Sequence, residues 1–173
     1  GVFALPAVAA QASHLRLDKS YYAISGKSRE EIKASVRFRG PKGGSAYGLT
    51  TIDFLPRWKT LAEGGTCRVV DVDVGLRIAM RLPRWHSGPD EAAPAAARRF
   101  VTSIERHEMG HVAIAKRHAA EMGRLLAKLV SNNGCWPLYR MAEEAIAGVK
   151  RRHLGAHRLY DERTRRGIRG LLN

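Results

Sequence analysis

The stretch Arg106-His107-Glu108-Met109-Gly110-His111 decides how the rest of the chain is organised. It matches the pattern H-E-x-x-H, in which the two histidines are four residues apart. Residues at this spacing lie on one face of a helix, so His107 and His111 can bind a single metal ion. Glu108 lies beside them and can reach a water molecule bound to that metal. The alternative is a surface helix that carries two histidines and a glutamate without a site.

The residues around this motif have the spacing of a buried helix stripe. Steps of four and three alternate through Ala97, Val101, Ile104, Glu108, His111, Ala115, His118, Met122, Leu125 and Leu129. Helices pack against their neighbours through such a stripe, so the pattern predicts a long helix that ends near Val130. A Glu and a His on a buried stripe are destabilising unless they are paired, hydrogen-bonded or bound to metal. The pattern therefore favours a buried site over a surface helix.

Before the motif, the sequence predicts three strands. A short strand is expected at residues 21–25, and a second at 46–55, where Pro56 ends it. The strongest signal is at residues 70–82, where apolar residues alternate with polar or small ones. One apolar face of this kind is typical of an antiparallel sheet that packs on helices.

Two further helices complete the expected fold. Ser28 and Glu31 form a capping box, which predicts a short helix between the first two strands. Residues 132–134 predict a turn after the motif helix, and a second long helical pattern begins at Leu138. Strands followed by helices predict an α+β fold. We expect a small antiparallel sheet packed on the motif helix and on a second long C-terminal helix.

The N-terminal residues have the composition of a processed leader. Residues 1–12 are mostly apolar and end in Ala10-Gln11-Ala12, a small-x-small pattern typical of a signal-peptide cleavage site. A flexible, alanine-rich leader is the alternative. No apolar run approaches the roughly 20 residues that a membrane-spanning helix needs. We expect residues 13–173 to form a single domain.

The two cysteines help to predict the cellular compartment of the protein. Cys67 and Cys135 are not part of a C-x-x-C pair, which argues against a cysteine zinc site. In an exported protein we expect them to form one disulfide. Two unpaired buried thiols are the alternative. A signal-peptide remnant and a disulfide together favour a secreted or periplasmic protein.

The chain is strongly basic, with 30 Lys and Arg against 16 Asp and Glu and a net charge of +14. Such an excess suggests an anionic partner, such as a cell-envelope polymer, lipid head groups or nucleic acid. No specific nucleic-acid motif accompanies it, and only 7% of the residues are aromatic. We interpret the charge as a solvated face with non-specific affinity for anions.

A catalytic zinc needs a third protein ligand besides two histidines. If the two long helices form an antiparallel hairpin that turns near Asn133, residues at equal distances from the turn lie at equal height. Residues 155–159 then lie opposite the motif, whereas Glu143 and Glu144 are about 15 Å away along the helix. The candidates near the right height, spaced four apart on one face, are His153, His157 and Asp161.

Motifs along most of the chain resemble those of one bacterial family. They are Tyr22-x-x-x-Gly26, Gly40-Pro41, Cys67-x-Val69, Leu82-Pro83-x-Trp85, His107-Glu108-x-Gly110-His111 and Tyr160-Asp161-x-x-Thr164-x-Arg166-Gly167. The chain resembles the family of predicted secreted zinc-dependent proteases (domain-of-unknown-function family 922) over residues 21–167. It departs from that family at Arg166, where members typically have His.

The resemblance implies a zincin-like peptidase that binds one zinc ion. Because Asp161 matches the last motif, we expect it to complete the ligand set with His107 and His111. His157 is the reserve candidate for the third ligand.

The same resemblance implies hydrolysis of a peptide or protein substrate, with Glu108 as the catalytic general base. Tyr160 is a candidate transition-state stabiliser, although its position on the helix suits core packing better. The alternative function is an inactive zincin-like module that binds an anionic envelope component or nucleic acid through its basic surface.

Overall fold

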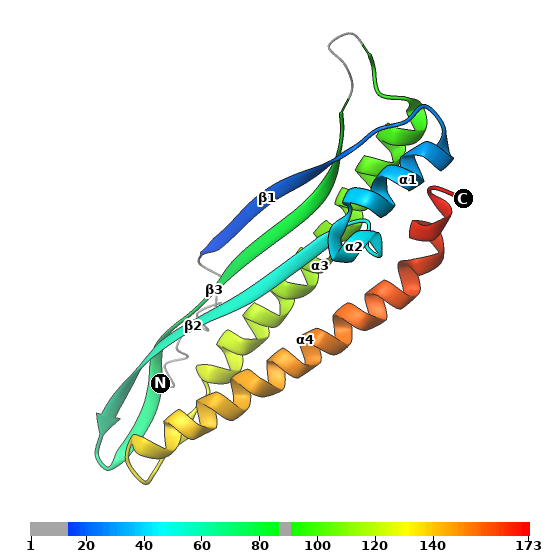
Figure 1. Ribbon diagram of the computed structural model, residues 1–173. Coiled ribbons are helices and arrows are strands. Elements are labelled where there is room, and N and C mark those ends of the chain that lie inside the picture. The colour runs from blue at the N-terminus through cyan, green and yellow to red at the C-terminus, as the bar shows by residue number, and fades with distance from the viewer. Residues whose placement is uncertain (1–13, 87–90) are drawn as a thin grey trace, which may run out of the picture. The chain divides into compact units, whose positions relative to one another are not determined.

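A computed structural model describes residues 14–86 and 91–173 of the chain (Figure 1). The elements follow in the order β1 (Leu15–Ile24), α1 (Arg29–Arg39), α2 (Pro41–Gly44), β2 (Leu49–Glu63), β3 (Thr66–Trp85), α3 (Ala95–Leu126), β4 (Val130–Ser131) and α4 (Trp136–Gly170). The α+β class is therefore confirmed. The expected leader, residues 1–12, lies outside the described residues.

The described residues form two compact units. The disulfide unit contains residues 14–15, 54–76 and 116–152. The cavity unit contains the described part of residues 16–53, 77–115 and 153–173. The H-E-x-x-H motif and all three candidates for the third ligand belong to the cavity unit.

The sheet is mixed, so the prediction of a wholly antiparallel sheet is wrong. The strand order is β1-β3-β2, and the short strand β4 pairs antiparallel with β3. In the cavity unit, Ser20 Oγ donates to Met80 O (3.4 Å) and His86 N–H donates to Ile24 O (2.9 Å). Residue numbers rise together along β1 and β3, which means that these strands are parallel. Parallel neighbours need a long connection, and α1, α2 and β2 provide it.

The second strand is longer than predicted. The sequence suggested that Pro56 would end it, but β2 continues to Glu63. Proline lacks the backbone N–H of a ladder hydrogen bond and is tolerated on an edge strand. Among the described strands, in the order β1-β3-β2, β2 has a neighbour on one side only, so Pro56 can be accommodated within it.

The disulfide unit contains the predicted bridge between Cys67 and Cys135. The two sulfur atoms are 2.03 Å apart, and the residues are separated by 68 positions in the sequence. Cys67 is fully buried in a cluster with Val69 and Leu138. Closing a loop of this length stabilises the fold by about 4 kcal/mol in the chain-entropy account.

The end of α3 also lies in the disulfide unit, and it comes earlier than predicted. The helix ends at Leu126 rather than near Val130, because Val130 and Ser131 form β4. This strand pairs Ser131 with Cys67 on β3, next to the disulfide. The last apolar residue of the predicted stripe, Leu129, therefore lies outside the helix, and its carbonyl accepts from Val69 N–H on β3.

In the cavity unit, α1 begins as the sequence predicts. Ser28 Oγ accepts a hydrogen bond from Glu31 N–H (3.2 Å), and the Glu31 carboxylate accepts from Ser28 N–H (3.3 Å). This is the predicted capping box. Ile32 and Val36 are fully buried on one face of the helix. The opposite part of α1 is left free to face solvent.

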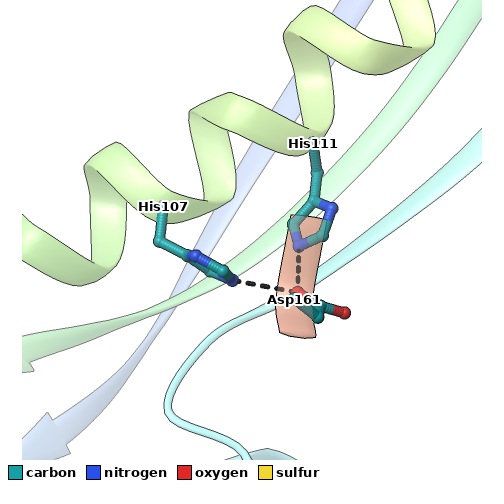
Figure 2. Close-up of side chains that lie close together, drawn as sticks. All are labelled: His107, His111 and Asp161. Atoms are coloured by element: carbon teal, nitrogen blue, oxygen red, sulfur yellow. Dashed lines mark ion pairs between the residues drawn. The ribbon is translucent and has the colours of Figure 1, made fainter. Parts of the chain in front are cut away.

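The stripe predicted for α3 is the buried one. Within the cavity unit, Ile104, Glu108, His111 and Ala115 are all buried. Segments of α3 and α4 lie side by side in this unit, with Asp161 at the height of His107 and His111 (Figures 1 and 2). The height correspondence predicted for an antiparallel helix pair is therefore present.

Candidate metal centre

Two histidines of α3 and one aspartate of α4 come together in the cavity unit (Figure 2). His107 Nε2 lies 3.2 Å, and His111 Nε2 lies 3.0 Å, from the same atom, Asp161 Oδ1. One ligand atom from each of the three residues lies within 4.8 Å of the others. We call these residues the His–His–Asp group.

The spacing of these atoms suits a small divalent metal ion. Tetrahedral zinc has bonds of about 2.0–2.2 Å to imidazole nitrogen and carboxylate oxygen, which separates two ligand atoms by roughly 3.3 Å. The two N–O distances, 3.0 and 3.2 Å, are close to that value. The side chains of His107 and His111 are 12% and 8% exposed, whereas that of Asp161 is 53% exposed. The group is thus buried on its α3 side and open on its α4 side.

Burial favours the form of His111 that can bind a metal. Removal from water lowers the pKa of the His111 imidazole, and the nearby Asp161 carboxylate opposes this with a smaller effect. The lowered pKa keeps the ring neutral, and a neutral imidazole has the lone pair that a metal needs. His111 Nδ1 is buried and makes no hydrogen bond within the described part of the chain.

His107 is oriented by a hydroxyl from α4. Thr164 Oγ1 lies 3.3 Å from His107 Nδ1, and the same hydroxyl donates to the Tyr160 carbonyl at 2.8 Å. Because a hydroxyl has a single proton, Thr164 can then only accept from His107. This places the imidazole proton on Nδ1 and leaves the lone pair on Nε2, which is the atom that faces Asp161.

Glu108 is a buried carboxylate held by the start of β2. Glu108 is only 4% exposed, and Thr50 Oγ1 donates a hydrogen bond to Glu108 Oε2 at 2.5 Å. Burial raises the pKa of Glu108, and the Thr50 hydrogen bond lowers it to a smaller extent. A Cβ atom at Gly48 would overlap the Glu108 carboxylate, so this close approach requires glycine.

Tyr160 packs on the motif helix. Its hydroxyl donates to the His107 carbonyl at 3.1 Å, and its ring stacks on the His107 ring at 5.0 Å between centroids. A side chain at Gly110 would overlap the Tyr160 hydroxyl and ring, so the glycine of the motif permits this contact. The geometry is that of a packing residue that fixes α4 against α3.

His157, the reserve ligand, is next to the His–His–Asp group but outside it. Its ring stacks on that of His111 with 4.5 Å between centroids, and it also contacts the buried His153 at 4.1 Å. A ring stacked face to face presents its π surface, and not a nitrogen lone pair, to its neighbour. Asp161 is therefore the residue of α4 that has an oxygen at the two Nε2 atoms.

A cavity of about 460 Å³ opens beside these residues. All three members of the His–His–Asp group line it, and so does Glu108. Its remaining walls come from α1, α2, the segment that leads into β2, and the end of α4. The four chemically active side chains therefore share one cavity with room for part of a ligand.

Three residues of this site did not emerge from the sequence. Gly48 and Thr50 contact Glu108 across 58 or more positions, and no spacing rule connects them to the motif. Thr164 is different, because it belongs to the Tyr160-Asp161-x-x-Thr164 motif. Its position three residues after Asp161 on a helix was a signal that could have identified it as a partner of the same site.

Comparisons with known proteins give a family and no activity. No curated protein and no solved structure matches the chain. A family model described as bacterial protein of unknown function (DUF922) matches residues 19–167. This range includes the cavity residues on α1 and α2, the whole H-E-x-x-H motif and Asp161 with Thr164. The chain belongs to this bacterial family, DUF922.

Proposed function

We propose that this protein is a zinc-dependent peptidase that acts outside the cytoplasm. The observation that carries the proposal is the His–His–Asp group with the buried carboxylate of Glu108 beside it in one cavity. Two imidazoles and one carboxylate are a ligand set that catalytic zinc sites use, with a fourth position left for water or substrate. The exposed side of Asp161 leaves that position accessible.

The chemistry follows from these side chains. Zinc in such a site lowers the pKa of a water molecule and polarises a peptide carbonyl. Glu108 accepts the proton of the attacking water and then delivers it to the leaving amine. Thr50 holds the second carboxylate oxygen of Glu108, which fixes the direction in which the free oxygen points. Burial raises the pKa of Glu108, which makes its carboxylate a stronger base.

The departure from the family motif at Arg166 leaves this set intact. Arg166 is exposed on α4 and does not line the cavity, whereas Asp161, Thr164 and Arg165 do. Arg166 comes five positions after Asp161 on the helix, which turns the two side chains about 140° apart. A histidine at position 166 is therefore not needed as a ligand in the site that we propose.

Location outside the cytoplasm rests on the disulfide. Disulfides persist in the periplasm and in secreted proteins and are rare in the cytosol. Cys67 and Cys135 form such a bridge. Among the described helices, none is long and apolar enough to cross a membrane.

Metal content and peptide hydrolysis test the proposal together. Protein purified without added metal is expected to contain about one zinc ion per chain by elemental analysis. Treatment with a chelator should abolish hydrolysis of a peptide mixture, and added zinc should restore it. His107→Ala and His111→Ala should lose the metal, whereas His86→Ala, at an exposed histidine outside the group, should keep it. Wild-type protein without bound zinc would favour the alternative of a binding module.

Thr164→Val is expected to lower zinc affinity by about tenfold, the lower end of the range for loss of a residue that orients a metal ligand. Valine has the shape of threonine but cannot accept the Nδ1 proton of His107, so the imidazole loses its fixed tautomer. Competition with a chromophoric chelator measures the affinity. Thr164→Ser retains the hydroxyl and serves as the control. Equal affinity of the Val and Ser variants would contradict the positioning role.

A further inference from the structure

The cavity beside the His–His–Asp group has a strongly basic lining. Five cationic residues contribute to it, and we call them the cationic rim: Lys33, Arg37, Lys42, Arg165 and Arg169. The carboxylates in the same lining are those of Glu108 and Asp161. Both acids have partners within the site, Thr50 for Glu108 and the two histidines for Asp161. The rim is therefore not neutralised by the acids of the cavity.

The rim is arranged along two helices of the cavity unit. Lys33 and Arg37 are four residues apart on α1, and therefore lie on one face of that helix. On α4, Arg165 and Arg169 continue the face that begins with Asp161, about 6 and 12 Å farther along the helix axis. Figure 1 shows α1 and α2 near the C-terminal end of α4. The positive charges thus extend away from the metal ligands in one direction.

The rim residues have no carboxylate partner in the described part of the chain. Among the residues that the structure describes, none of the five forms an ion pair with an acidic side chain. Lys33 donates to the neutral side chain of Asn173, and Lys42 is close enough for its charge to act on Glu108. Elsewhere, cations of the sheet and helices do pair with acids, as in Arg57–Asp73 and Arg152–Glu121. Other arginines, such as Arg158 and Arg166, also lack an ion pair among the described residues, but the five rim residues are the ones that line the cavity.

Apolar side chains also contribute to the lining of the cavity. Ile104 of α3, Ile168 of α4 and Leu49 at the start of β2 contribute to it. An extended peptide advances about 3.3 Å per residue, so the 6–12 Å from Asp161 to the two arginines corresponds to roughly two to four residues. A chain that lies along this wall can contact both apolar side chains and guanidinium groups.

We propose that the cationic rim binds carboxylate groups of an acidic peptide segment, two to four residues from the bond that is cut. Arg guanidinium matches a carboxylate with two parallel hydrogen bonds, and Arg165 and Arg169 can each offer such a pair. The carboxylates can be Asp or Glu side chains or the C-terminal carboxylate of the peptide. The position of the cut bond rests on the peptidase function proposed above, whereas binding to the rim does not.

An acidic peptide fits the lining better than a nucleic acid does. Proteins that bind single strands combine positive charge with aromatic side chains on which bases stack. In the lining described here the aromatic side chains are Tyr47 and three histidines, of which His107 and His111 belong to the metal ligands. Apolar side chains beside arginines suit a peptide with mixed apolar and acidic residues.

The test measures binding rather than cleavage. Glu108→Gln protein is mixed with fluorescently labelled decapeptides that differ only in having three Glu or three Gln residues, and fluorescence anisotropy gives the Kd. We expect the Glu peptide to bind about tenfold more tightly, since a few partly exposed ion pairs contribute about 1.4 kcal/mol together. The difference should shrink when the salt concentration is raised, because exposed charges are screened. Equal Kd values for the two peptides, together with no effect of C-terminal amidation on either, would overturn the proposal.

Two double variants with the same change in charge locate the binding. Arg165→Gln/Arg169→Gln removes two rim residues, and Arg158→Gln/Arg166→Gln removes two exposed arginines of the same segment of α4 that do not line the cavity. The first should lose most of the preference for the Glu peptide, and the second should keep it. An equal loss in both variants would show that net charge, and not the rim, attracts the peptide.

Two further comparisons identify the source of the charge. Amidation of the Gln peptide tests the terminal carboxylate separately. If amidation weakens its binding, the rim binds the terminal carboxylate, and if only the Glu-to-Gln change alters the Kd, the rim binds acidic side chains; both results support the proposal. Polyphosphate that displaces the peptide from wild type and binds more tightly than the Glu peptide would overturn it in favour of a phosphate polymer. Repeating the titration after metal removal separates the two proposals. A preference that survives without zinc stands even if the peptidase function fails.

Discussion

Glu108→Gln is expected to keep its metal and to lose peptide hydrolysis. Glutamine has the size of glutamate, and its side-chain oxygen can still accept the Thr50 hydroxyl, so the buried position is retained. Its amide cannot accept a proton from water, so the general-base step fails. General acid–base catalysis contributes roughly 10²–10⁴-fold, and kcat/KM should fall by an amount in that range.

The measurement combines zinc content with kcat/KM on the same preparation. Glu108 is not a member of the His–His–Asp group, so its substitution should leave the zinc content unchanged. A loss of hydrolysis at unchanged zinc content then shows that the base, and not the metal site, has been lost. Glu105→Gln is the matched control. It makes the same chemical change on the same helix at a partly exposed residue that pairs with Lys19. Turnover by Glu108→Gln equal to that of the control would show that Glu108 is not the base.

The geometry around Glu108 explains why this residue is buried at all. An unpaired carboxylate in the interior is destabilising, and the Thr50 hydrogen bond offsets only part of the cost, so burial raises the pKa of Glu108. Gly48 brings the main chain of the segment before β2 against the same carboxylate. Both contacts restrict the side chain to one position beside the His–His–Asp group. This local cost to stability is typical of a site that is maintained for its chemistry.

The helical part of the site could be predicted from the sequence. The stripe with steps of four and three identified Glu108 and His111 as buried, because helical side chains repeat every 3.6 residues. A constant rise per residue on two helices joined by one turn left His153, His157 and Asp161 as candidates opposite the motif, and the resemblance to the family motif favoured Asp161. Both properties belong to the helix itself, so they can be calculated from residue numbers.

The sheet and its contacts could not be predicted in the same way. The parallel pairing of β1 with β3 depends on the path of the intervening chain, which local periodicity does not report. The same applies to Thr50, whose contact with Glu108 depends on how β2 packs against α3. The early end of α3 also has a tertiary cause, because Val130 and Ser131 pair with β3 next to the disulfide. In each case a long-range contact overrides a local preference.

Asp161→Ala is expected to lower zinc affinity by more than about a hundredfold, which is the upper end of the range for losing a residue that merely orients a ligand. The change removes the oxygen that lies 3.0–3.2 Å from both Nε2 atoms and leaves two histidines without a third ligand. The Asp161 side chain is 53% exposed, so its removal should leave the fold intact, and an unchanged circular dichroism spectrum checks this.

Three control variants determine whether Asp161 is the third ligand. Glu162→Ala removes the neighbouring exposed acid, and Glu143→Ala removes an acid of the disulfide unit, so both should keep zinc. His157→Ala removes a ring that stacks on His111 without a ligand atom in the group, and its zinc affinity should fall far less than that of Asp161→Ala. Chelator competition at one pH compares all four variants. A loss in His157→Ala equal to that in Asp161→Ala would make His157 a ligand, and a loss confined to Glu143→Ala would refute the arrangement of α3 and α4 on which the site depends.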